Sequence, residues 1–332
     1  ALFIGLIASS VFFIFSTQKR IEVIHTSKEH LLLDSYYGIQ LGLQQVKVND
    51  SLQYIHPSGD TSLIRKFLWG SYYLVTAETK KNERSFKRSA LIGSEFQPSI
   101  PSFVLRSGSD GLKIAGETKL EGAVYIPGKR IDLAYIGGKN YTNSKMVFGE
   151  INDIKDLKLS LAKDFENISP QNFVGNLRPT PFLFKDTNVS FLSEGIYFQN
   201  LNAVHVKTKL QGKIVLPRIY IKHGFKGTLQ ALASEKIILE DSVTLNYPST
   251  LILNELNPGT FEELHTIHLG TNSSVLGGIL VTTQQFDFRR QPKLMIEKNA
   301  VVAGIVFNAG VTETYGVIIG SLSTSSTLTK TG

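Results

Sequence analysis

The chain of 332 residues contains no cysteine, which excludes disulfide bonds, thiolate metal sites and cysteine nucleophiles. The absence of cysteine does not assign the protein to a compartment, because many bacterial envelope proteins also lack it. Glycine and proline are too few to indicate disorder, and hydrophobic residues make up 42% of the sequence. The chain can therefore bury a sizeable core, and its length suggests about two structural units.

The common catalytic and nucleotide-binding motifs are also missing. The sequence contains no Gly-x-Ser-x-Gly, no P-loop, no His-Glu-x-x-His and no dinucleotide fingerprint. The net charge is +7, but the basic residues are dispersed, and several alternate with apolar residues inside predicted strands, as at Lys207, Lys209 and Lys213. This alternation is typical of the solvated face of a sheet. Because no nucleic-acid-binding motif accompanies it, we expect no nucleic-acid partner.

Charge is absent from the first part of the chain, and residues 1–15 are almost wholly apolar. Such a run is slightly shorter than the roughly 20 apolar residues that cross a bilayer. A signal-peptide core is the alternative, but no small-x-small cleavage site follows the run. We predict a transmembrane anchor at 1–17 and a single-pass protein of the cytoplasmic (inner) membrane, with the lipid bilayer as a partner and the bulk of the chain periplasmic or otherwise extracytoplasmic. The anchor residues are Leu2, Phe3, Ile4, Leu6, Ile7, Val11, Phe12, Phe13, Ile14 and Phe15.

Helical periodicity continues after the apolar run. From residue 18 to about residue 48, apolar residues such as Ile21, Ile24 and Leu31 recur on one helical face, and no proline occurs before Pro57. The two segments together predict one helix of about 48 residues, about 70 Å long. We assign residues 18–56 to an amphipathic stalk, which is either free or packed on its own domain.

A small β unit is predicted over residues 57–100. Residues 69–77 have the composition of a strand, residues 80–84 that of a turn, and residues 85–92 that of the returning strand. Together they predict a β-hairpin. The segment 97–101 marks the end of the unit because it contains two prolines.

The strongest signal in the sequence is a pattern that recurs five times. It runs apolar-x-apolar, three to five residues, then apolar-x-Gly-x-apolar, and its clearest copy joins Leu294-Met295-Ile296 to Val302-Ala303-Gly304-Ile305-Val306. Each half has the period of a strand with one buried face. A glycine that recurs at one place indicates a tight corner or a close approach of neighbouring coils. The corner glycines are Gly122, Gly212, Gly227, Gly277 and Gly304.

Short strands that cannot bury their inner face alone and that repeat along a chain are typical of a solenoid. We therefore predict a mainly β protein with one long N-terminal α-helix, in which a β-helix (solenoid) of short strands follows the small β-hairpin unit. The predicted segments are first β-helix rungs at 101–149, an insertion or cap at 150–203, the β-helix at 204–320 and a Ser/Thr-rich tail at 321–332. An antiparallel sandwich is the alternative, because its strands also alternate.

Candidates for chemistry are few. His265 and His268 stand three apart, and positions three apart in a strand point to opposite faces, so they form a poor metal pair. Asp287, Arg289 and Arg290 form a charge cluster, but a calcium site needs several converging oxygen ligands and only Asp287 is available locally. We predict no catalytic residue, no metal, no cofactor and no small-molecule substrate. The remaining candidates, expected at solvated turns, are the acidic pairs Glu240 with Asp241 and Glu262 with Glu263.

Two parts of the sequence resemble known families. The stretch from Asn299 to Val306 resembles the rungs of bactofilins and other bacterial polymer-forming β-helix proteins. The N-terminal half, an apolar helix running into an amphipathic one and then a small β unit, resembles type IV pilins and type II secretion pseudopilins. Gly5 stands where these families usually carry a glutamate if Ala1 is the mature start, which favours the minor pseudopilin class, and no prepilin cleavage motif is present. The combination is similar to envelope proteins of Bacteroidetes that pair such an anchor with a β-rich repeat domain.

The pilin resemblance implies a membrane-anchored structural component of a bacterial envelope machine for protein transport. The chain would be a pseudopilin-like subunit of a type II secretion or type IV pilus-type system, with other subunits of the assembly as partners and a periplasmic β-helix that makes protein contacts. No enzymatic activity is expected. Two alternatives stay open: a surface carbohydrate-active β-helix enzyme, which a converging acidic and basic cluster would favour, and a membrane-tethered bactofilin-like polymer.

Overall fold

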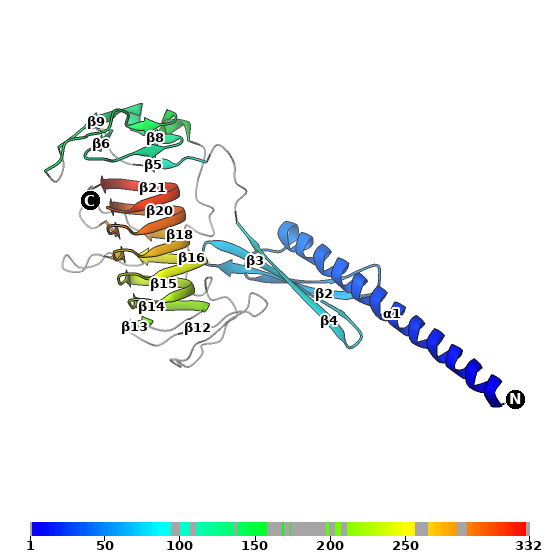
Figure 1. Ribbon diagram of the computed structural model, residues 1–332. Helices are drawn as coiled ribbons and strands as arrows, with labels where there is room; N and C mark the ends of the chain where they lie inside the picture. Colours follow the sequence, from blue (N-terminus) through cyan, green and yellow to red (C-terminus); the bar gives the residue numbers. More distant parts are fainter. Residues whose placement is uncertain are drawn as a thin grey trace. The chain divides into compact units, whose positions relative to one another are not determined.

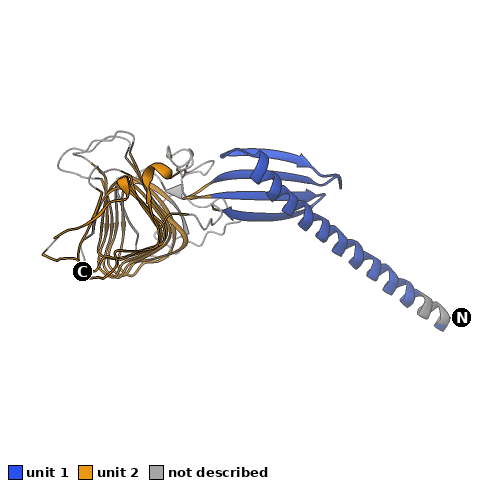
Figure 2. Ribbon diagram, turned by 90° about the horizontal axis from the view of Figure 1, so that it is seen from above, with its two compact units in different colours: residues 1–67, 73–92 blue, residues 68–72, 93–332 orange. Residues whose placement is uncertain are grey.

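The structure is a computed structural model, and it describes residues 2–93, 100–106, 111–135, 138–157, 168, 173, 197–198, 203–206, 211–255, 265–283 and 291–329. The chain forms two compact units, which Figure 2 shows in different colours. Unit 1 comprises residues 1–67 and 73–92, and unit 2 comprises residues 68–72 and 93–332. Among the described residues the protein is mainly β with one α-helix, and that helix is N-terminal, as predicted.

Helix α1 covers Leu2–Gln45 without a break (Figure 1). No proline interrupts these residues, so every interior backbone N–H can bond to the preceding turn. The helix ends shortly before Asn49, whose backbone is left-handed with a φ of 63°. Asparagine tolerates this conformation better than most residues, which suits it to the turn between the helix and the first strand.

The predicted membrane location is wrong. In the part of the chain that the structure describes, no helix combines the length and the apolar character needed to cross a membrane. The prediction rested on residues 1–15 alone, whereas a spanning helix needs about 20 apolar residues. Helix α1 continues directly from this run into the charged residues Lys19, Arg20 and Glu22.

Unit 1 contains a four-stranded sheet in the order β1-β2-β3-β4, formed by β1 (Asp50–Ile55), β2 (Thr61–Trp69), β3 (Tyr72–Lys81) and β4 (Arg84–Ile92). Strands β3 and β4 pair antiparallel from Tyr73 opposite Ile92 to Lys81 opposite Arg84, which confirms the predicted hairpin. The turn is shorter than predicted. Only Asn82 and Glu83 connect the strands, and Asn82 has a left-handed φ of 52°, as two-residue hairpin turns require.

The predicted strand at 69–77 is wrong at its start. Strand β2 ends at Trp69 and β3 begins at Tyr72, so Gly70 and Ser71 form a turn. Gly70 has a φ of 66°, a conformation that breaks an extended strand. Residues 68–72 belong to unit 2, where the Ser71 backbone N–H donates to Oγ1 of Thr250 at 3.1 Å and the Ser71 hydroxyl lies 3.0 Å from the same atom.

The second half of α1 packs on the sheet of unit 1. Ile39 from the helix and Val46, which follows the end of the helix, are buried against Ile64 and Val75 from the strands. Small residues permit this close approach. A Cβ on Gly42 would lie 2.5 Å from Cγ1 of Val75 and 2.9 Å from Cγ2 of Ile64, so any larger residue would push the helix away from the sheet.

Unit 2 is built around a parallel, solenoid-like sheet, to which 13 strands belong among the described residues. Ten of them lie in the order β11-β8-β5-β21-β20-β18-β16-β15-β14-β12, and three further strands pair beside this row. The long strands stack on one another in Figure 1. They are β14 (Gln211–Ile221), β15 (Lys226–Leu239), β16 (Thr244–Glu255), β18 (Ser274–Thr283), β20 (Val301–Thr314) and β21 (Val317–Thr329), with the shorter β12 (Tyr197–Phe198), β13 (Ala203–Val206), β17 (Thr266–Leu269) and β19 (Lys293–Ile296).

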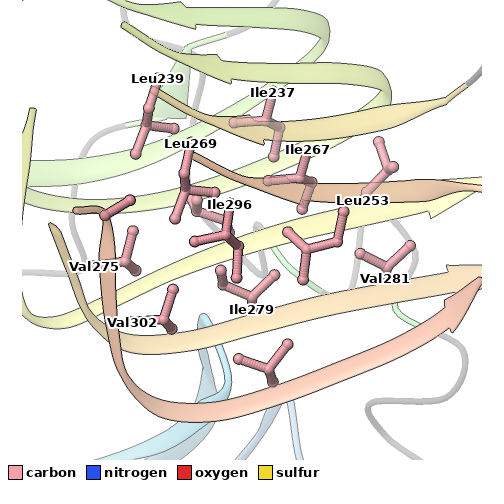
Figure 3. Packing of buried hydrophobic residues seen from close by; sticks show 14 of the residues in the cluster. Ile237, Leu239, Leu253, Ile267, Leu269, Val275, Ile279, Val281, Ile296 and Val302 are labelled. Atoms are coloured by element: carbon pink, nitrogen blue, oxygen red, sulfur yellow. The ribbon is translucent and has the colours of Figure 1, made fainter. Parts of the chain in front are cut away.

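Residues at equivalent places in successive coils form apolar columns inside the sheet. Ile237 is in register with Ile267, and Ile267 is in register with Leu294. A neighbouring column contains Leu239, Leu269 and Ile296. All six side chains are fully buried. Figure 3 shows Ile237 next to Ile267, and Leu239, Leu269 and Ile296 following one another from coil to coil. Complete burial of such a side chain contributes about 1.5 to 3 kcal/mol, so the columns dominate the stability of unit 2.

The order of the strands in space differs from their order in the chain. Strand β5 (Phe103–Leu105) pairs with β21, Phe103 opposite Leu322, so early and late segments of unit 2 are neighbours. Strand β11 ends the row on one side and β12 ends it on the other. The remaining strands near β5 are β6 (Leu112–Ile114), β7 (Leu120–Glu121), β8 (Val124–Ile126), β9 (Ile131–Leu133), β10 (Val147–Phe148) and β11 (Ile151–Asp153).

The expected Ser/Thr-rich tail begins inside a strand, because β21 continues to Thr329. In this part of β21, hydroxyl-bearing side chains take the buried positions that apolar side chains occupy in the other strands. Oγ1 of Thr324 lies 2.9 Å from Oγ1 of Thr312, which accepts from Nδ2 of Asn308 at 2.9 Å. All three side chains are fully buried, and these hydrogen bonds allow polar groups to replace apolar ones in the interior.

Most of the predicted insertion at 150–203 lies outside the described residues. At its start, strand β11 ends at Asp153 and is followed by one 3₁₀ turn, η2 (Ile154–Asp156). The Lys155 backbone N–H donates to Oδ1 of Asp153 at 3.0 Å. A second 3₁₀ turn, η1 (Pro127–Lys129), links β8 to β9.

Candidate functional site

The first half of α1 exposes large apolar side chains on every side. Consecutive helical residues differ in direction by about 100°, so Phe12, Phe13, Ile14 and Phe15 point in four directions. All four are exposed, by 76%, 71%, 60% and 66%. Of the other predicted anchor residues, Phe3 and Val11 are exposed too. Outside the described residues lie the side chains of Leu2, Ile4, Leu6 and Ile7.

The exposed apolar surface continues along the packed half of the same helix. While Leu31 and Ile39 face the sheet, Leu33 and Tyr36 on the other side of the helix are exposed. The Tyr36 ring is not isolated, since the Arg88 guanidinium lies 5.7 Å from its centroid. We define the exposed apolar residues of α1 as the helix surface; exposed polar residues from His25 to His30 divide it into two parts. The helix surface comprises Phe3, Val11, Phe12, Phe13, Ile14, Phe15, Ile21, Val23, Leu32, Leu33, Tyr36 and Tyr37.

His56 is the centre of a buried polar chain that connects α1 to the sheet of unit 1. Its Nδ1 lies 3.3 Å from Oδ1 of Asp34 on α1, and its Nε2 lies 2.7 Å from Oγ of Ser62 on β2. The Ser62 hydroxyl in turn lies 2.6 Å from Oγ1 of Thr79 on β3. The chain also extends to the loop after β1, because Ser58 Oγ donates to Oδ2 of Asp34 at 2.8 Å.

These residue types are those of a Ser-His-Asp hydrolase triad, in which the carboxylate orients the imidazole and the imidazole activates the hydroxyl. The surroundings do not permit that chemistry. Ser62 is completely buried and its hydroxyl is held by Thr79, so no substrate carbonyl can approach it. The arrangement instead satisfies the buried polar groups and fixes the helix on the sheet. Sequence reasoning missed it, because the three residues lie in three different elements and match no motif.

Aromatic rings enclose the imidazole of His56. The Tyr54 ring centroid lies 4.9 Å from that of His56 and the Tyr37 centroid lies 5.9 Å from it, both edge-on. A hydrogen bond with Tyr37, together with burial, raises the pKa of the Tyr54 hydroxyl. The phenol of Tyr54 therefore stays neutral beside the imidazole.

In unit 2, stacked turns connect the two halves of the repeated pattern. Ser242, Asn272 and Asn299 occupy equivalent places in three of these turns and have left-handed φ values of 59°, 55° and 59°. The turns are also bonded to one another, since Asn299 Nδ2 donates to Oδ1 of Asn272 at 3.2 Å. Short polar side chains tolerate this backbone, which explains why the repeat places them between its apolar halves.

The acidic pair Glu240 and Asp241 lies on this stack of turns. Glu240 pairs with Lys222 from the preceding turn, and Asp241 accepts the backbone N–H of Thr271 from the next one at 2.8 Å. Hydrogen bonds from the Thr271 hydroxyl and backbone N–H, with smaller contributions from His223 and His268, lower the pKa of Asp241. The pair therefore bonds successive turns to each other.

Other ion pairs follow the same rule. Arg218 Nε lies 2.5 Å from Oε2 of Glu235, and Lys293 Nζ lies 2.8 Å from Oε2 of Glu313. Each pair joins neighbouring coils, and the charges do not converge on one point. Within the part of the chain that the structure describes, no group of His, Cys, Asp and Glu side chains could hold a metal ion.

The candidate histidines are separate. His265 is buried just before β17, whereas His268 on β17 is partly exposed and its Nε2 lies 3.2 Å from Oε1 of Glu297. His268 is thus paired with Glu297, and neither histidine belongs to a group of described side chains that could hold a metal ion. Asp287, Arg289, Arg290, Glu262 and Glu263 lie outside the described residues.

The structure places two of the predicted corner glycines in one column. Gly277 is in register with Gly304, and Gly304 with Gly320, which the sequence pattern had not included. Their φ values are 147°, 149° and 133°, and a Cβ on Gly304 would overlap the carbonyl oxygen of Gly277. Of the other predicted glycines, Gly122 follows β7 with a φ of 97°, while Gly212 and Gly227 lie within β14 and β15.

No protein-family model, no curated protein and no solved structure matches this chain. The resemblances to bactofilins and to pilins therefore stay predictions. A function can be inferred from three features: the helix surface, the buried polar chain of His56 and the stacked turns of unit 2.

Proposed function

We propose that the protein is a structural subunit that assembles with other subunits through the helix surface. The observation that supports this proposal most strongly is the exposure of Phe12, Phe13 and Phe15 on different sides of one helix. A helix that is apolar all round is stable in water only when other groups surround it. Contiguous apolar patches of this kind mark interaction sites on proteins.

The occupant of the helix surface in this proposal is the same helix of like subunits. One neighbour would cover only one side of a cylinder that is apolar on all sides, so several helices must surround each one. Packing between helices would continue along Leu33 and Tyr36, which are exposed where α1 already lies on its own sheet. This arrangement is the one that the resemblance to type IV pilins and type II secretion pseudopilins implies.

In the same proposal, the solenoid-like sheet of unit 2 is a β-helix that provides protein contacts. Its support is the register, in which each long strand pairs with different neighbours along its length. Strand β15, for example, pairs with β16 through Ala231 and with β17 through Ile237. We propose no enzymatic activity, because the ion pairs Arg218–Glu235 and Lys293–Glu313 bond neighbouring coils without converging on one point and Ser62 in unit 1 is inaccessible.

The test is the mass of the assembly formed by the full chain in solution, measured by sedimentation velocity and by electron microscopy. The helix variant, Phe12→Gln with Phe13→Gln and Phe15→Gln, keeps good helix formers but removes the apolar surface. We expect the wild type to form ordered multimers and the helix variant to lose them, with at least a tenfold drop in mass. The matched control is Phe86→Gln, an exposed aromatic residue on β4.

The control should leave the assembly unchanged. If the helix variant and the wild type have the same mass, the helix surface is not the assembly interface and the proposal fails. Amorphous aggregates of the wild type without a defined species would also contradict it, because packed helices specify a geometry.

A further inference from the structure

Strand β4 is the last strand on one side of the sheet in unit 1, and β3 is its only partner among the described strands. Residues 2–92 are described without a gap, so no undescribed segment of unit 1 can add a fifth strand beside β4. Residues of an antiparallel strand alternate between those that bond to the neighbour and those whose N–H and C=O groups face away from it. The free side of β4 therefore presents backbone donors and acceptors at every second residue.

The hairpin turn determines which residues these are. Lys81 is in register with Arg84 across a two-residue turn, so Arg84 belongs to the set that bonds to β3. Every second residue after it, Phe86 and then Arg88, belongs to the same set. The residues between them direct their N–H and C=O groups to the free side, and they are Ser85, Lys87 and Ser89.

Positive charge is concentrated at the turn end of β4. The segment 80–88 contains five basic residues and one acidic residue. Ion pairs with Glu78 and Asp60 account for two of the basic residues. Arg84 and Lys87, in contrast, form no ion pair with a described residue. Because they stand three apart in a strand, their charges lie on opposite faces of the sheet, one on each side of the free edge.

This end of β4 is accessible. Arg84 and Ser85 are exposed, Lys87 is partly exposed, and Phe86 is 36% exposed. The accessible part of the strand thus combines free backbone groups, two cations without a described carboxylate partner and one apolar ring. Such a combination suits a partner that has both a peptide backbone and negative charge.

We define the basic edge as the free side of β4 from Arg84 to Ser89, with the side chains of Arg84, Phe86 and Lys87. We propose that the basic edge binds an extended acidic segment of another protein, which adds to the sheet as a fifth strand. The backbone of such a segment supplies partners for the outward N–H and C=O groups. Its carboxylates supply the charge opposite to that of Arg84 and Lys87.

The charges of the basic edge disfavour the same edge of a second copy as the partner. In that pairing, Arg84 and Lys87 of both chains would be neighbours on adjoining strands, where like charges are destabilising. Charge of one sign along an edge therefore acts against self-pairing and favours a partner of opposite sign. A nucleic acid would satisfy the two cations, but it has no peptide groups to pair with a strand.

The test measures, by fluorescence anisotropy, the binding of a labelled peptide of about ten residues in which glutamate alternates with valine. The protein is the full-length helix variant, so that assembly through α1 cannot change the signal, and the wild type is measured beside it. In one control peptide proline replaces valine, which keeps the charge but prevents strand pairing. In the other, lysine replaces glutamate. We expect the first peptide to bind at least about tenfold more tightly than either control.

The charge variant, Arg84→Glu with Lys87→Glu, should bind the peptide at least about tenfold more weakly. Its matched control, Lys226→Glu with Lys298→Glu, makes the same change in net charge at two exposed lysines of unit 2 and should keep the affinity. Circular dichroism confirms that both proteins are folded. If the charge variant keeps its affinity, or if the control loses as much, the basic edge is not the site and the inference is wrong.

Hydrogen exchange tests the added strand residue by residue. The bound peptide should slow the exchange of the outward amides of Ser85, Lys87 and Ser89 by at least about tenfold. The amides of Arg84 and Phe86 already bond to β3, so their exchange should change little. Binding without this alternation would show that charge alone holds the peptide, and the fifth strand would be ruled out.

Two further comparisons separate the alternatives. A single-stranded oligonucleotide of equal charge should bind more weakly than the peptide, and equal or tighter binding would assign the basic edge to nucleic acid instead of protein. The inference does not rest on the proposed assembly, because the helix surface lies on α1. An unchanged mass of the helix variant would contradict the proposed function alone, whereas a peptide that binds neither the wild type nor the helix variant would contradict this inference alone.

Discussion

The two units bury their interiors in different ways. Unit 1 packs one helix on one sheet and depends on contacts that occur once, such as Asp34 with His56 and His56 with Ser62. Unit 2 repeats the same contacts from coil to coil, as in the column Ile237, Ile267 and Leu294. A unique contact has no substitute when it is lost, whereas a repeated one affects mainly its nearest neighbours. Changes in the two units should therefore spread over different distances.

The largest effect is expected from Ile267→Ala, in the middle of the apolar column of unit 2. Removing a fully buried isoleucine leaves a cavity and should lower the free energy of unfolding by about 3 to 4 kcal/mol. The loss is measured by denaturant unfolding, and hydrogen exchange shows where it occurs. Faster exchange should centre on β15, β17 and β19. The control Ile319→Ala, at an exposed site, should stay within about 0.5 kcal/mol of the wild type.

If exchange increased equally throughout both units after this substitution, unit 2 would not behave as a stack of neighbouring layers. The contrast between the repeated contacts of unit 2 and the unique contacts of unit 1 would then be lost.

A somewhat smaller effect is expected from Gly304→Ala in the glycine column. The new Cβ would overlap the carbonyl oxygen of Gly277, and relief of that overlap requires two coils to separate. We expect a loss of about 2 to 3 kcal/mol, measured by denaturant unfolding. The control Gly224→Ala has a φ of 75° but open space around its Cβ, so it should cost only about 1 kcal/mol. Equal losses would mean that backbone conformation, and not the close approach, selects glycine.

In unit 1, His56→Leu should cost about 2 kcal/mol, because it leaves the buried groups of Asp34 and Ser62 without their partner. Hydrogen exchange should rise along the second half of α1 and across β1 to β3, and remain unchanged in β14 to β20. His30→Leu, on an exposed part of α1, is the control and should have little effect. An unchanged exchange rate in α1 would show that the polar chain does not hold the helix on the sheet.

The smallest effect is expected from Asp241→Asn on the stack of turns. The pKa of Asp241 is lowered from its ordinary value of 3.8 by its bonds to Thr271. Its ionised form therefore stabilises the folded state above that value, and the contribution is lost as the pH falls through the folded-state pKa. The variant should melt slightly below the wild type at pH 7, and the difference should vanish at strongly acidic pH. A difference that persists in acid would assign the effect to geometry instead of charge.

Much of the architecture could be predicted from the sequence. The unbroken run without proline predicts α1, the alternation around residues 80–84 predicts the hairpin of β3 and β4, and the repeated pattern predicts a solenoid-like β unit. These features are local, so a few neighbouring residues determine them. The membrane location failed because it extended a short apolar run into a charged helix.

The contacts that matter for function were harder to predict. Leu133 belongs to the segment Ile131-Asp132-Leu133, which alternates in the same way as an interior coil, yet Leu133 is 64% exposed, so the alternation alone does not predict burial. Asp34, His56 and Ser62 meet only because α1 lies on the sheet. The pairing of β5 with β21 depends on the order in which the layers stack in space. Repeats with similar sequences do not specify that order.

The pairing of β5 with β21 has a consequence for synthesis of the chain. Pro101 and Ser321, which are bonded across this junction, stand 220 residues apart in the sequence. At about 5 to 20 residues per second, a ribosome needs roughly 10 to 40 s to make the second partner after the first. During that interval the edge of β5 has no native neighbour, and a nascent chain with an open edge is prone to wrong pairing. The stack of unit 2 therefore closes at an internal layer, so that the strands beside β5 are sealed only after the segment up to β21 has been translated.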